Sequence, residues 1–510
     1  MPAGLFATQP LERLRAAAGQ EGGGLRRTLG PLNLTTLGIG AIVGTGIFVF
    51  TGMAAAQYAG PAVPISMVIA AIACGFAGLC YAEMASAVPV AGSAYTYSYA
   101  TLGELIAWII GWDLILEYAM GAATVAVGWS STLGSMLGLF GITPPAAVMN
   151  PPFIACTAAQ VANGMATGCT QVGWHLTGAV FNLPAALSIL AITAILIIGI
   201  RESAGFNTTI VIIKVGVLAL FVGFGFLYVK TANWHPFIPQ NNGEFGGWSG
   251  ILRGAGLMFF AYIGFDSVST AAQEARNPQK DMPVSILASL VICTILYVLV
   301  STVLTGLAPY QDLNVPSPVI MVVDSIKQFG WFRYAITFGA ILGLGSTMLV
   351  MLLGQSRVLY AMSRDGLIPE WAGRVHPKFK TPWLSTAITG VAVALFSGLF
   401  PIQILGQLVN IGTLLAFVLV SLGVWVLRKT RPDLERPFKT PLVPFVPILG
   451  ALACLGLMLT LGLDTWLRLV VWLVIGLVIY FRYGRHHSAL SRGVERDGDV
   501  RNPAQVGNRG

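Results

Sequence analysis

Two apolar stretches of the sequence are interrupted by glycine: GIGAIVGTGIF at residues 38–48 and FFAYIGFDS at residues 259–267. The first holds four glycines within nine residues, and each costs about 1 kcal/mol of helix propensity relative to alanine. The second places Asp266 just after Gly264 in an apolar run. Irregular backbone at membrane depth persists only where it lines a cavity or is buried in protein. We therefore predict helix breaks at Val43–Gly46 and at Gly264, with a binding site between them. The alternative for the first stretch is a glycine face that packs against a neighbouring helix.

The composition around these stretches is that of a membrane protein. Of the 510 residues, 55% are hydrophobic and only 10% charged, and the mean hydropathy is +0.76, whereas soluble domains carry about 25% charged residues. The apolar runs are long rather than alternating, which favours spanning helices over a barrel. We predict an all-α polytopic membrane protein with about twelve transmembrane helices. The expected helices lie near residues 32–57, 62–88, 103–137, 182–200, 206–229, 249–273, 283–308, 334–364, 384–401, 405–428, 444–463 and 466–484.

The basic residues predict the orientation in the membrane. The first 30 residues contain arginines but no apolar core of a signal peptide, so we expect the first helix to act as the targeting signal. With the N-terminus inside, the positive-inside rule is obeyed, and both termini are expected to be cytoplasmic. The net charge of +8 is then explained by this bias and by contact with membrane lipid; it does not indicate nucleic acid. Few basic residues are expected on the outer side of the membrane: Lys230, Arg253, Lys327, Arg333 and Arg468.

Cysteine and histidine patterns give no sign of a metal site or of an enzyme. Cys156 and Cys169 lie in the long outer loop after the third helix, where a disulfide is one alternative and free thiols the other. No CxxC or HExxH pattern occurs, no histidine lies in a predicted span, and no nucleophile has a base beside it. The other cysteines fall within apolar spans, where we expect them to pack as small hydrophobes: Cys74, Cys80, Cys293 and Cys454.

The two breaks together predict a site for a zwitterion. A broken helix offers free N–H groups at the start of one half and free C=O groups at the end of the other, with matching partial charges. N–H groups at the first break and the hydroxyl of Thr45 could hold a carboxylate. The backbone would then recognise the invariant part of an α-amino acid. The expected carboxylate-binding N–H groups are those of Gly44, Thr45 and Gly46, and the expected ammonium acceptors are the carbonyls of Ile42, Phe260, Ala261 and Ile263.

Ionisable residues inside spans are candidates for function. Glu117 lies about 21 Å along the third helix from its cytoplasmic start and could pair with a cationic substrate side chain; the alternative is a hydrogen bond between helices. Asp113, one turn earlier, is more readily explained as structural. Burial favours the neutral form of Lys214, so this lysine could gain and lose a proton, or its ammonium could replace a sodium ion; the alternative is a permanent ion pair. Glu83 is expected to be structural or part of a cytoplasmic gate.

Five ordered segments resemble the amino acid–polyamine–organocation superfamily, in a bacterial branch similar to the cationic amino acid transporters. Several of them contain the residues discussed above, and together with the helix pattern they cover most of residues 30–480. Five ordered segments are far more specific than one glycine-rich run. The matching segments are residues 38–48, 81–118, 205–214, 259–283 and 354–369.

The resemblance implies a fold of two inverted five-helix repeats, with interrupted helices 1 and 6 and with helices 11 and 12 peripheral. It places the carboxylate-binding role on Thr45 and Gly46 with their neighbours, including Val43, and the ammonium-binding role on the second break. It also implies that Phe265 is an aromatic gate and that Asp266 lies close to the side-chain pocket. The implied divisions are a cytoplasmic tail (1–31), the first repeat (32–230), the second repeat (249–428), the peripheral helices (444–484) and a second cytoplasmic tail (485–510).

The resemblance also implies the activity. It indicates a permease that imports L-α-amino acids, cationic ones such as arginine and lysine and also small neutral ones such as alanine, by proton symport with alternating access. Glu117 matches the family's acidic position in helix three, and Lys214 matches the lysine that replaces the second sodium ion. The resemblance implies that protons are the coupling ion, that no cofactor or metal is needed, and that the protein lies in a bacterial inner membrane. The alternatives are a sodium-coupled or exchange-type amino acid or polyamine carrier, and a small single-helix accessory subunit is a further candidate partner.

Overall fold

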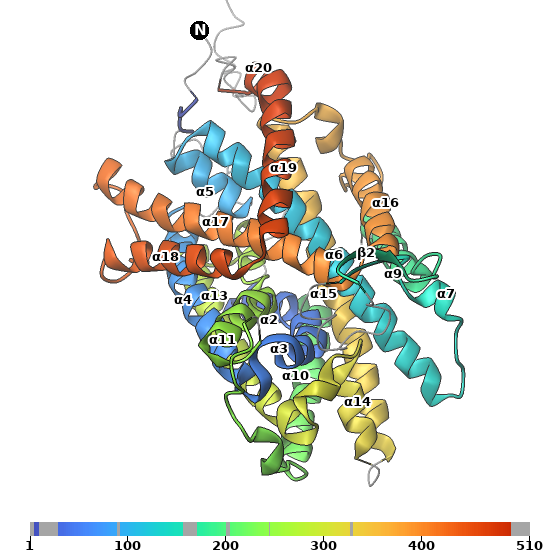
Figure 1. Ribbon diagram of the computed structural model, residues 1–510. Coiled ribbons are helices and arrows are strands. Elements are labelled where there is room, and N and C mark those ends of the chain that lie inside the picture. Colours follow the sequence, from blue (N-terminus) through green and yellow to red (C-terminus); the bar gives the residue numbers. More distant parts are fainter. Residues whose placement is uncertain are drawn as a thin grey trace, which may run out of the picture.

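The computed structural model describes residues 5–9, 29–88, 92–156, 171–199, 204–243, 245–326 and 330–490. Within these residues almost all regular structure is helical (Figure 1). Eight helical stretches are long and apolar enough to cross a membrane, and four shorter apolar helices accompany them. The predicted class, an all-α polytopic membrane protein, is therefore confirmed.

The described spans follow one another in the predicted order. The first span consists of α2 (Pro31–Ile42), a π-helical segment (Gly46–Phe50), α3 (Thr51–Ala54) and a second π-helical segment (Ala55–Ala59), and the sixth consists of α11 (Gly247–Met258), a 3-10 turn (Phe259–Tyr262) and α12 (Ser267–Thr270). The remaining spans are α4 (Val63–Ala87), α6 (Glu104–Leu139), α9 (Leu183–Ile198), α10 (Ala204–Phe226), α13 (Pro278–Leu307), α15 (Gly330–Arg364), α16 (Trp383–Leu399), α17 (Ile402–Thr430), α18 (Phe445–Thr460) and α19 (Leu463–Ile479).

Some boundaries differ from the predicted ones for identifiable reasons. The seventh span was expected to begin near residue 283. It begins instead at Pro278, because this proline takes the first position of the helix, which proline favours, and Pro283 lies inside the helix. A short helix, α5 (Ser93–Thr101), was not predicted and precedes the third span.

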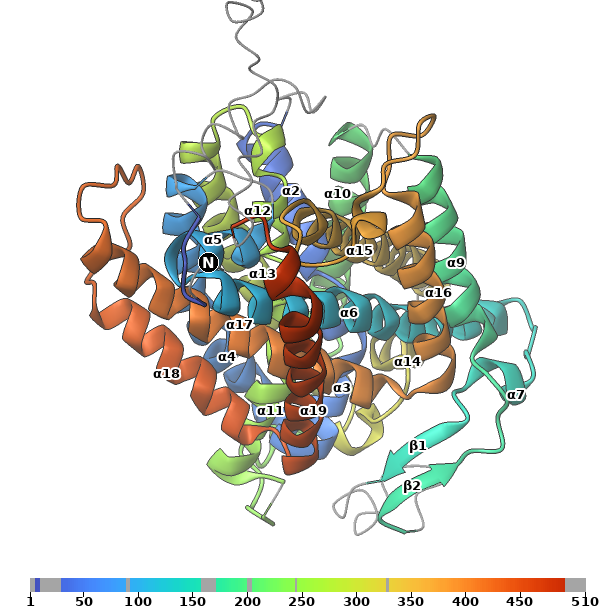
Figure 2. The same cartoon turned by 90° about the horizontal axis from the view of Figure 1, so that it is seen from above.

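The two long helices α6 and α15 form the centre of the molecule and pack against each other. Helix α6 also packs against α17, and both long helices contact α9. In Figure 2, α6 crosses the middle of the molecule, whereas α18 and the hairpin of β1 (Phe153–Cys156) and β2 (Gly173–Leu176) lie at its edge. The strands pair antiparallel, with Phe153 opposite Leu176. The site described below lies in the buried interior between these helices.

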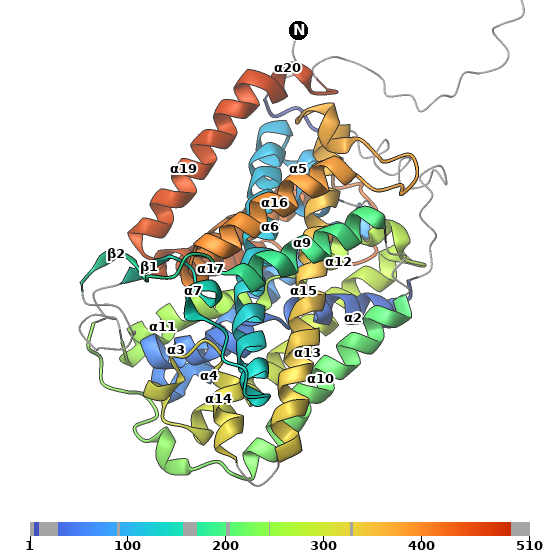
Figure 3. The same ribbon diagram turned by 90° about the vertical axis from the view of Figure 1, so that its right-hand side faces the viewer.

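Helix α19 lies along one edge of the molecule, as Figure 3 shows. It is attached to α6 by a reciprocal pair of indoles: Trp112 Nε1 donates to the Trp472 carbonyl at 2.9 Å, and Trp472 Nε1 donates to the Trp112 carbonyl at 3.2 Å. The rings are stacked with their centroids 4.4 Å apart. The twelfth helix is thus peripheral but firmly docked.

Both ends of the described chain meet at the same side of the molecule (Figure 1). The backbone N–H of Gln9 donates to the Tyr99 carbonyl, and that of Ala489 donates to the Asp365 carbonyl. We call this the terminal side. The opposite side, where the hairpin and the Asn182–Gly398 backbone hydrogen bond lie, is called the hairpin side.

Candidate functional site

The first helix breaks where its glycines predicted. Helix α2 ends at Ile42, and Val43 is extended, with φ −74° and ψ 93°. A new helical segment begins at Gly46, and the first N–H groups of such a segment have no partner within it. The hydroxyl of Thr45 is buried and has no hydrogen-bond partner. This side of the break therefore presents donors to the protein interior.

The sixth span breaks at the predicted glycine. The turn Phe259–Tyr262 is followed by Ile263 in an extended conformation and by Gly264 at φ +119°. This is a region that favours glycine, and a Cβ at this position would also lie 2.9 Å from the carbonyl carbon of Ala41. Helix α12 then restarts the span at Ser267.

The two breaks touch each other. A Cβ on Gly46 would lie 2.4 Å from the Cα of Ala261, so only glycine allows the two backbones to approach this closely. All the candidate substrate-binding residues are buried and belong to this region or to the facing part of α6: Ile42, Val43, Gly44, Thr45, Gly46, Glu117, Phe260, Ala261, Ile263, Phe265 and Asp266.

Lys214 crosses from α10 to the first break. Its Nζ donates to the carbonyls of Gly40 at 2.9 Å and Val43 at 2.6 Å, and to Thr347 Oγ1 at 3.0 Å. The lysine is fully buried, and these three acceptors are neutral oxygens rather than a carboxylate. The ammonium thus occupies a carbonyl cage of the kind that binds a metal cation, and it ties α10 and α15 to the broken helix.

The carboxyl groups lie on the other side of the breaks. Asp266 Oδ2 accepts a hydrogen bond from the Tyr118 hydroxyl at 3.0 Å, while Asp266 Oδ1 and Glu117 Oε1 are buried without a hydrogen-bond partner. Glu117 is 1% exposed, and no ion pair between the described residues includes either acid. Asp113 lies one turn before Glu117, and both of its oxygens are unpaired too.

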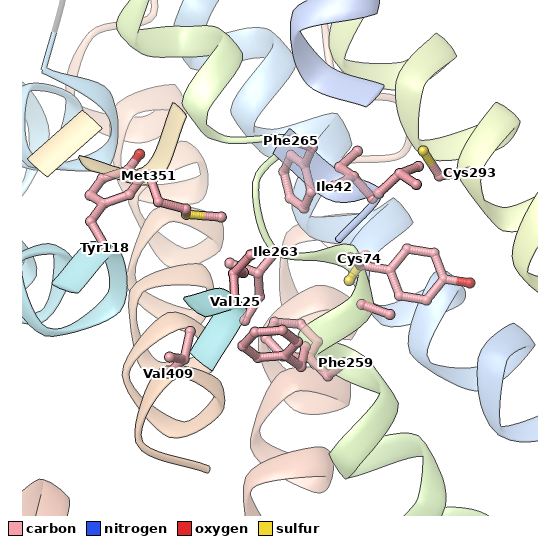
Figure 4. Close-up of a cluster of buried hydrophobic side chains, with 14 of the residues drawn as sticks. Ile42, Cys74, Tyr118, Val125, Phe259, Ile263, Phe265, Cys293, Met351 and Val409 are labelled. Carbon is pink, nitrogen blue, oxygen red and sulfur yellow. The ribbon is translucent and has the colours of Figure 1, made fainter. Parts of the chain in front are cut away.

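Apolar side chains fill the space between these polar groups. Figure 4 shows Ile263 next to Val125, with Val409 and Phe259 nearby and Met351 beside Tyr118. Phe265 packs against Phe417, with the ring centroids 5.0 Å apart, and also against Tyr81. The wall nearest the second break is therefore aliphatic and aromatic, although two carboxyl groups lie close by.

Comparison with known proteins agrees with this geometry. The family model described as amino acid permease matches residues 29–480. The chain belongs to this family. It is a permease of the amino acid–polyamine–organocation superfamily, as the sequence segments indicated.

Three relatives show the range of substrates around this permease. The branched-chain amino acid permease BcaP of Bacillus subtilis is 50% identical over 96% of the chain and 100% of its own length. The methylthioribose transporter of the same species is 45% identical over 96% of the chain and 99% of its own length. Cationic amino acid transporter 4, vacuolar, of Arabidopsis thaliana is 37% identical over 80% of the chain and 64% of its own length.

Several residues of the permease site were not predicted. Tyr297 donates to the Ile42 carbonyl at 2.8 Å, so one acceptor expected for an ammonium group already has a protein donor. The ring of Phe50 meets that of Phe260 edge to face, with the centroids 4.8 Å apart, close to the break. Tyr118 and Thr347 complete the polar contacts. Phe50 could have been recognised from the sequence, because it follows Gly46 by one helical turn. The other residues could not, because their contacts depend on how the helices pack.

Ion pairs close the permease on its terminal side. Arg357 of α15 contacts Glu274, just after α12, at 2.7 Å, and Arg428 of α17 binds both oxygens of Glu83 at 2.8 Å. Glu83 also accepts the backbone N–H of Thr440 at 2.7 Å. Glu83 therefore joins α4 to α17 and to the following loop.

Cysteines and metal ligands add little to the site. Cys156 forms a disulfide, but Cys169, its expected candidate partner, lies outside the described residues, as does most of each predicted tail. Among the residues that the structure describes, no cluster of side chains could hold a metal ion. The remaining cysteines are buried free thiols, as expected: Cys74, Cys80, Cys293 and Cys454.

Proposed function

We propose that the chain is a secondary active transporter that imports L-α-amino acids together with protons. The observation that carries the proposal is the Lys214 ammonium, held by the Gly40 and Val43 carbonyls directly beside the first break. A group that can be protonated there couples the position of α10 to the broken helix. Because the ammonium fills the carbonyl cage, a sodium-coupled carrier is the weaker alternative.

The proposed orientation places the terminal side in the cytoplasm of a bacterial cell and the hairpin side outside. The support is the positive-inside distribution of lysine and arginine. The Arg357–Glu274 and Glu83–Arg428 ion pairs then close the cytoplasmic side. When the protein opens towards the cytoplasm, the ion pairs between helices that move apart must break.

In the proposed cycle, substrate and proton enter from the outside and favour closure together. The substrate carboxylate binds the N–H groups at Gly44–Gly46 and the unpaired Thr45 hydroxyl, and its ammonium binds carbonyls at the second break. Protonated Lys214 holds Val43 in the extended conformation that the carboxylate site needs. Loss of the proton to the cytoplasm removes one set of hydrogen bonds to the break and resets the carrier.

The first candidate that we propose for the side chain of the substrate is an aliphatic group. Ile263, Val125 and Val409 supply an apolar wall, and a relative identical at half its positions is named a branched-chain permease. A cationic side chain is the second candidate, because Glu117 Oε1 is buried without a partner and would pair with arginine or lysine. Alanine would fit either wall. A single-helix accessory subunit stays a prediction.

Uptake into proteoliposomes tests the proposal. Leucine, arginine and alanine are offered with an inward proton gradient, with an inward sodium gradient and with neither. We expect accumulation only with the proton gradient, led by leucine. Accumulation driven by sodium, or equal uptake without any gradient, would contradict proton symport, and uptake led by arginine would favour the cationic alternative.

A further inference from the structure

A cavity of about 500 Å³ lies on the hairpin side, above the helix breaks. It has two walls that come from different parts of the chain. One is formed by the first span, by the loop after α13 and by the start of α17, and the other by the long loop that contains the hairpin. The residues used below line it: Val49, Gln57, Asn150, Ile154, Asn314 and Gln403.

The hairpin wall is attached to the helices of the scaffold. Phe153 stacks on Phe400, at the end of α16, with the ring centroids 6.0 Å apart, and Trp174 meets the same ring edge to face. The backbone N–H of Asn182 donates to the Gly398 carbonyl at 2.9 Å. The hairpin is therefore held in place by these contacts and forms a wall of the cavity.

The opposite wall belongs to the interrupted first span. Gln57 Nε2 donates to Asn314 Oδ1 at 2.9 Å, which joins this span to the loop after α13. Val49, which lines the cavity, immediately precedes Phe50, whose ring contacts Phe260 at the substrate site. The cavity is thus lined by the residue next to Phe50 in the first span.

The polar groups of the cavity are uncharged. Amides and hydroxyls line it, and none of its lining residues is Asp, Glu, Lys or Arg. An acid does lie in the adjoining hollow, but Asp324 is paired there with Arg333 at 3.1 Å. Amide groups can donate to a carboxylate and accept from an ammonium, so such a cavity suits a zwitterion without net charge.

We propose that this vestibule is a second, outer binding site, which loads neutral zwitterionic amino acids and favours them over cationic ones. This inference rests on the proposed function. The vestibule binds the substrate before the Phe50–Phe260 pair opens. A cationic amino acid gains no attraction there, because none of the described residues that line the vestibule carries a carboxylate, even though Glu117 lies deeper in the protein.

The test introduces one negative charge into the vestibule. Gln403→Glu keeps the shape of the side chain, and we expect the KM for arginine to fall about fivefold relative to the KM for leucine through local attraction. The matched control is Gln407→Glu, one turn further along α17, where Arg468 Nη1 already contacts Gln407 at 3.3 Å. The control should leave both KM values unchanged.

A second variant tests the same charge effect in case Gln403→Glu does not fold. Asn150→Asp puts a carboxylate on the opposite, exposed wall and should lower the arginine KM in the same direction. If wild-type protein transports leucine but neither variant changes the arginine KM, the vestibule proposal is wrong and the proposed function stands. If the wild type transports no amino acid, the proposed function is wrong, and the vestibule proposal falls with it.

Discussion

Two buried ionisable regions flank the helix breaks, and their polar atoms are satisfied to opposite degrees. On one side, the Lys214 ammonium has three oxygen acceptors at 2.6–3.0 Å. On the other, Glu117 Oε1 and Asp266 Oδ1 have no hydrogen-bond partner. A buried polar atom without a partner costs about 1–3 kcal/mol. The contrast teaches that the protein completes its cation cage with its own atoms and leaves the acid side incomplete, which agrees with a substrate arriving there.

The largest expected effect comes from removing the satisfied cation. In Lys214→Ala, we expect accumulation driven by a proton gradient to fall about 100-fold, because the titratable group that donates to the Gly40 and Val43 carbonyls is removed. Exchange of labelled for unlabelled leucine should persist and shows that the variant is folded. Proteoliposome uptake measures both. Accumulation at the wild-type level would mean that Lys214 is structural only.

The next effect concerns the incomplete acid side. In Glu117→Gln, we expect the affinity for arginine to fall about tenfold, because an ion pair formed in a buried site is lost, while leucine affinity changes less than about twofold. Competition uptake gives both values. Equal losses for the two substrates would assign Glu117 to helix packing.

A smaller effect should follow from loosening the cation cage. Thr347→Val keeps the volume of the side chain but removes one oxygen from the ammonium. Because the two carbonyl acceptors remain, we expect the rate of proton-driven uptake to fall about fivefold, which corresponds to the net loss of about 1 kcal/mol for one hydrogen bond. Ser346→Ala is the matched control, because its hydroxyl bonds only within its own helix, to the Gly343 carbonyl. Equal uptake rates in the two variants would show that the oxygen cage around the ammonium does not contribute to proton coupling.

The smallest effect is expected at the hydrogen bond between Tyr118 and Asp266. Tyr118→Phe removes the hydrogen bond to Asp266 and should change leucine affinity about threefold. Isothermal titration in detergent measures it. A loss as large as that of Lys214→Ala would show that the acid side depends on Tyr118 more than on a ligand, which would reverse the contrast drawn above.

The sequence predicted those parts of the site that violate the rules for an apolar helix. Glycines and a carboxylate in a span are costly, so the breaks and Lys214, Glu117 and Asp266 could be recognised without a fold. Tyr118 and Thr347 could not, because tyrosine and threonine are ordinary in membrane helices, and their role depends on which helix they face. The vestibule was missed because its loop shows no periodic pattern.

The indole pair between α6 and α19 has a practical consequence for measuring motion. Because Trp112 and Trp472 each bond to the other's backbone, α19 moves with α6. Val474, two residues further along, is about half exposed on the outer surface of this helix. A fluorescent dye attached there would report the motion of the central helix during turnover without entering the substrate site. Helix α19 is therefore a suitable labelling position for single-molecule spectroscopy.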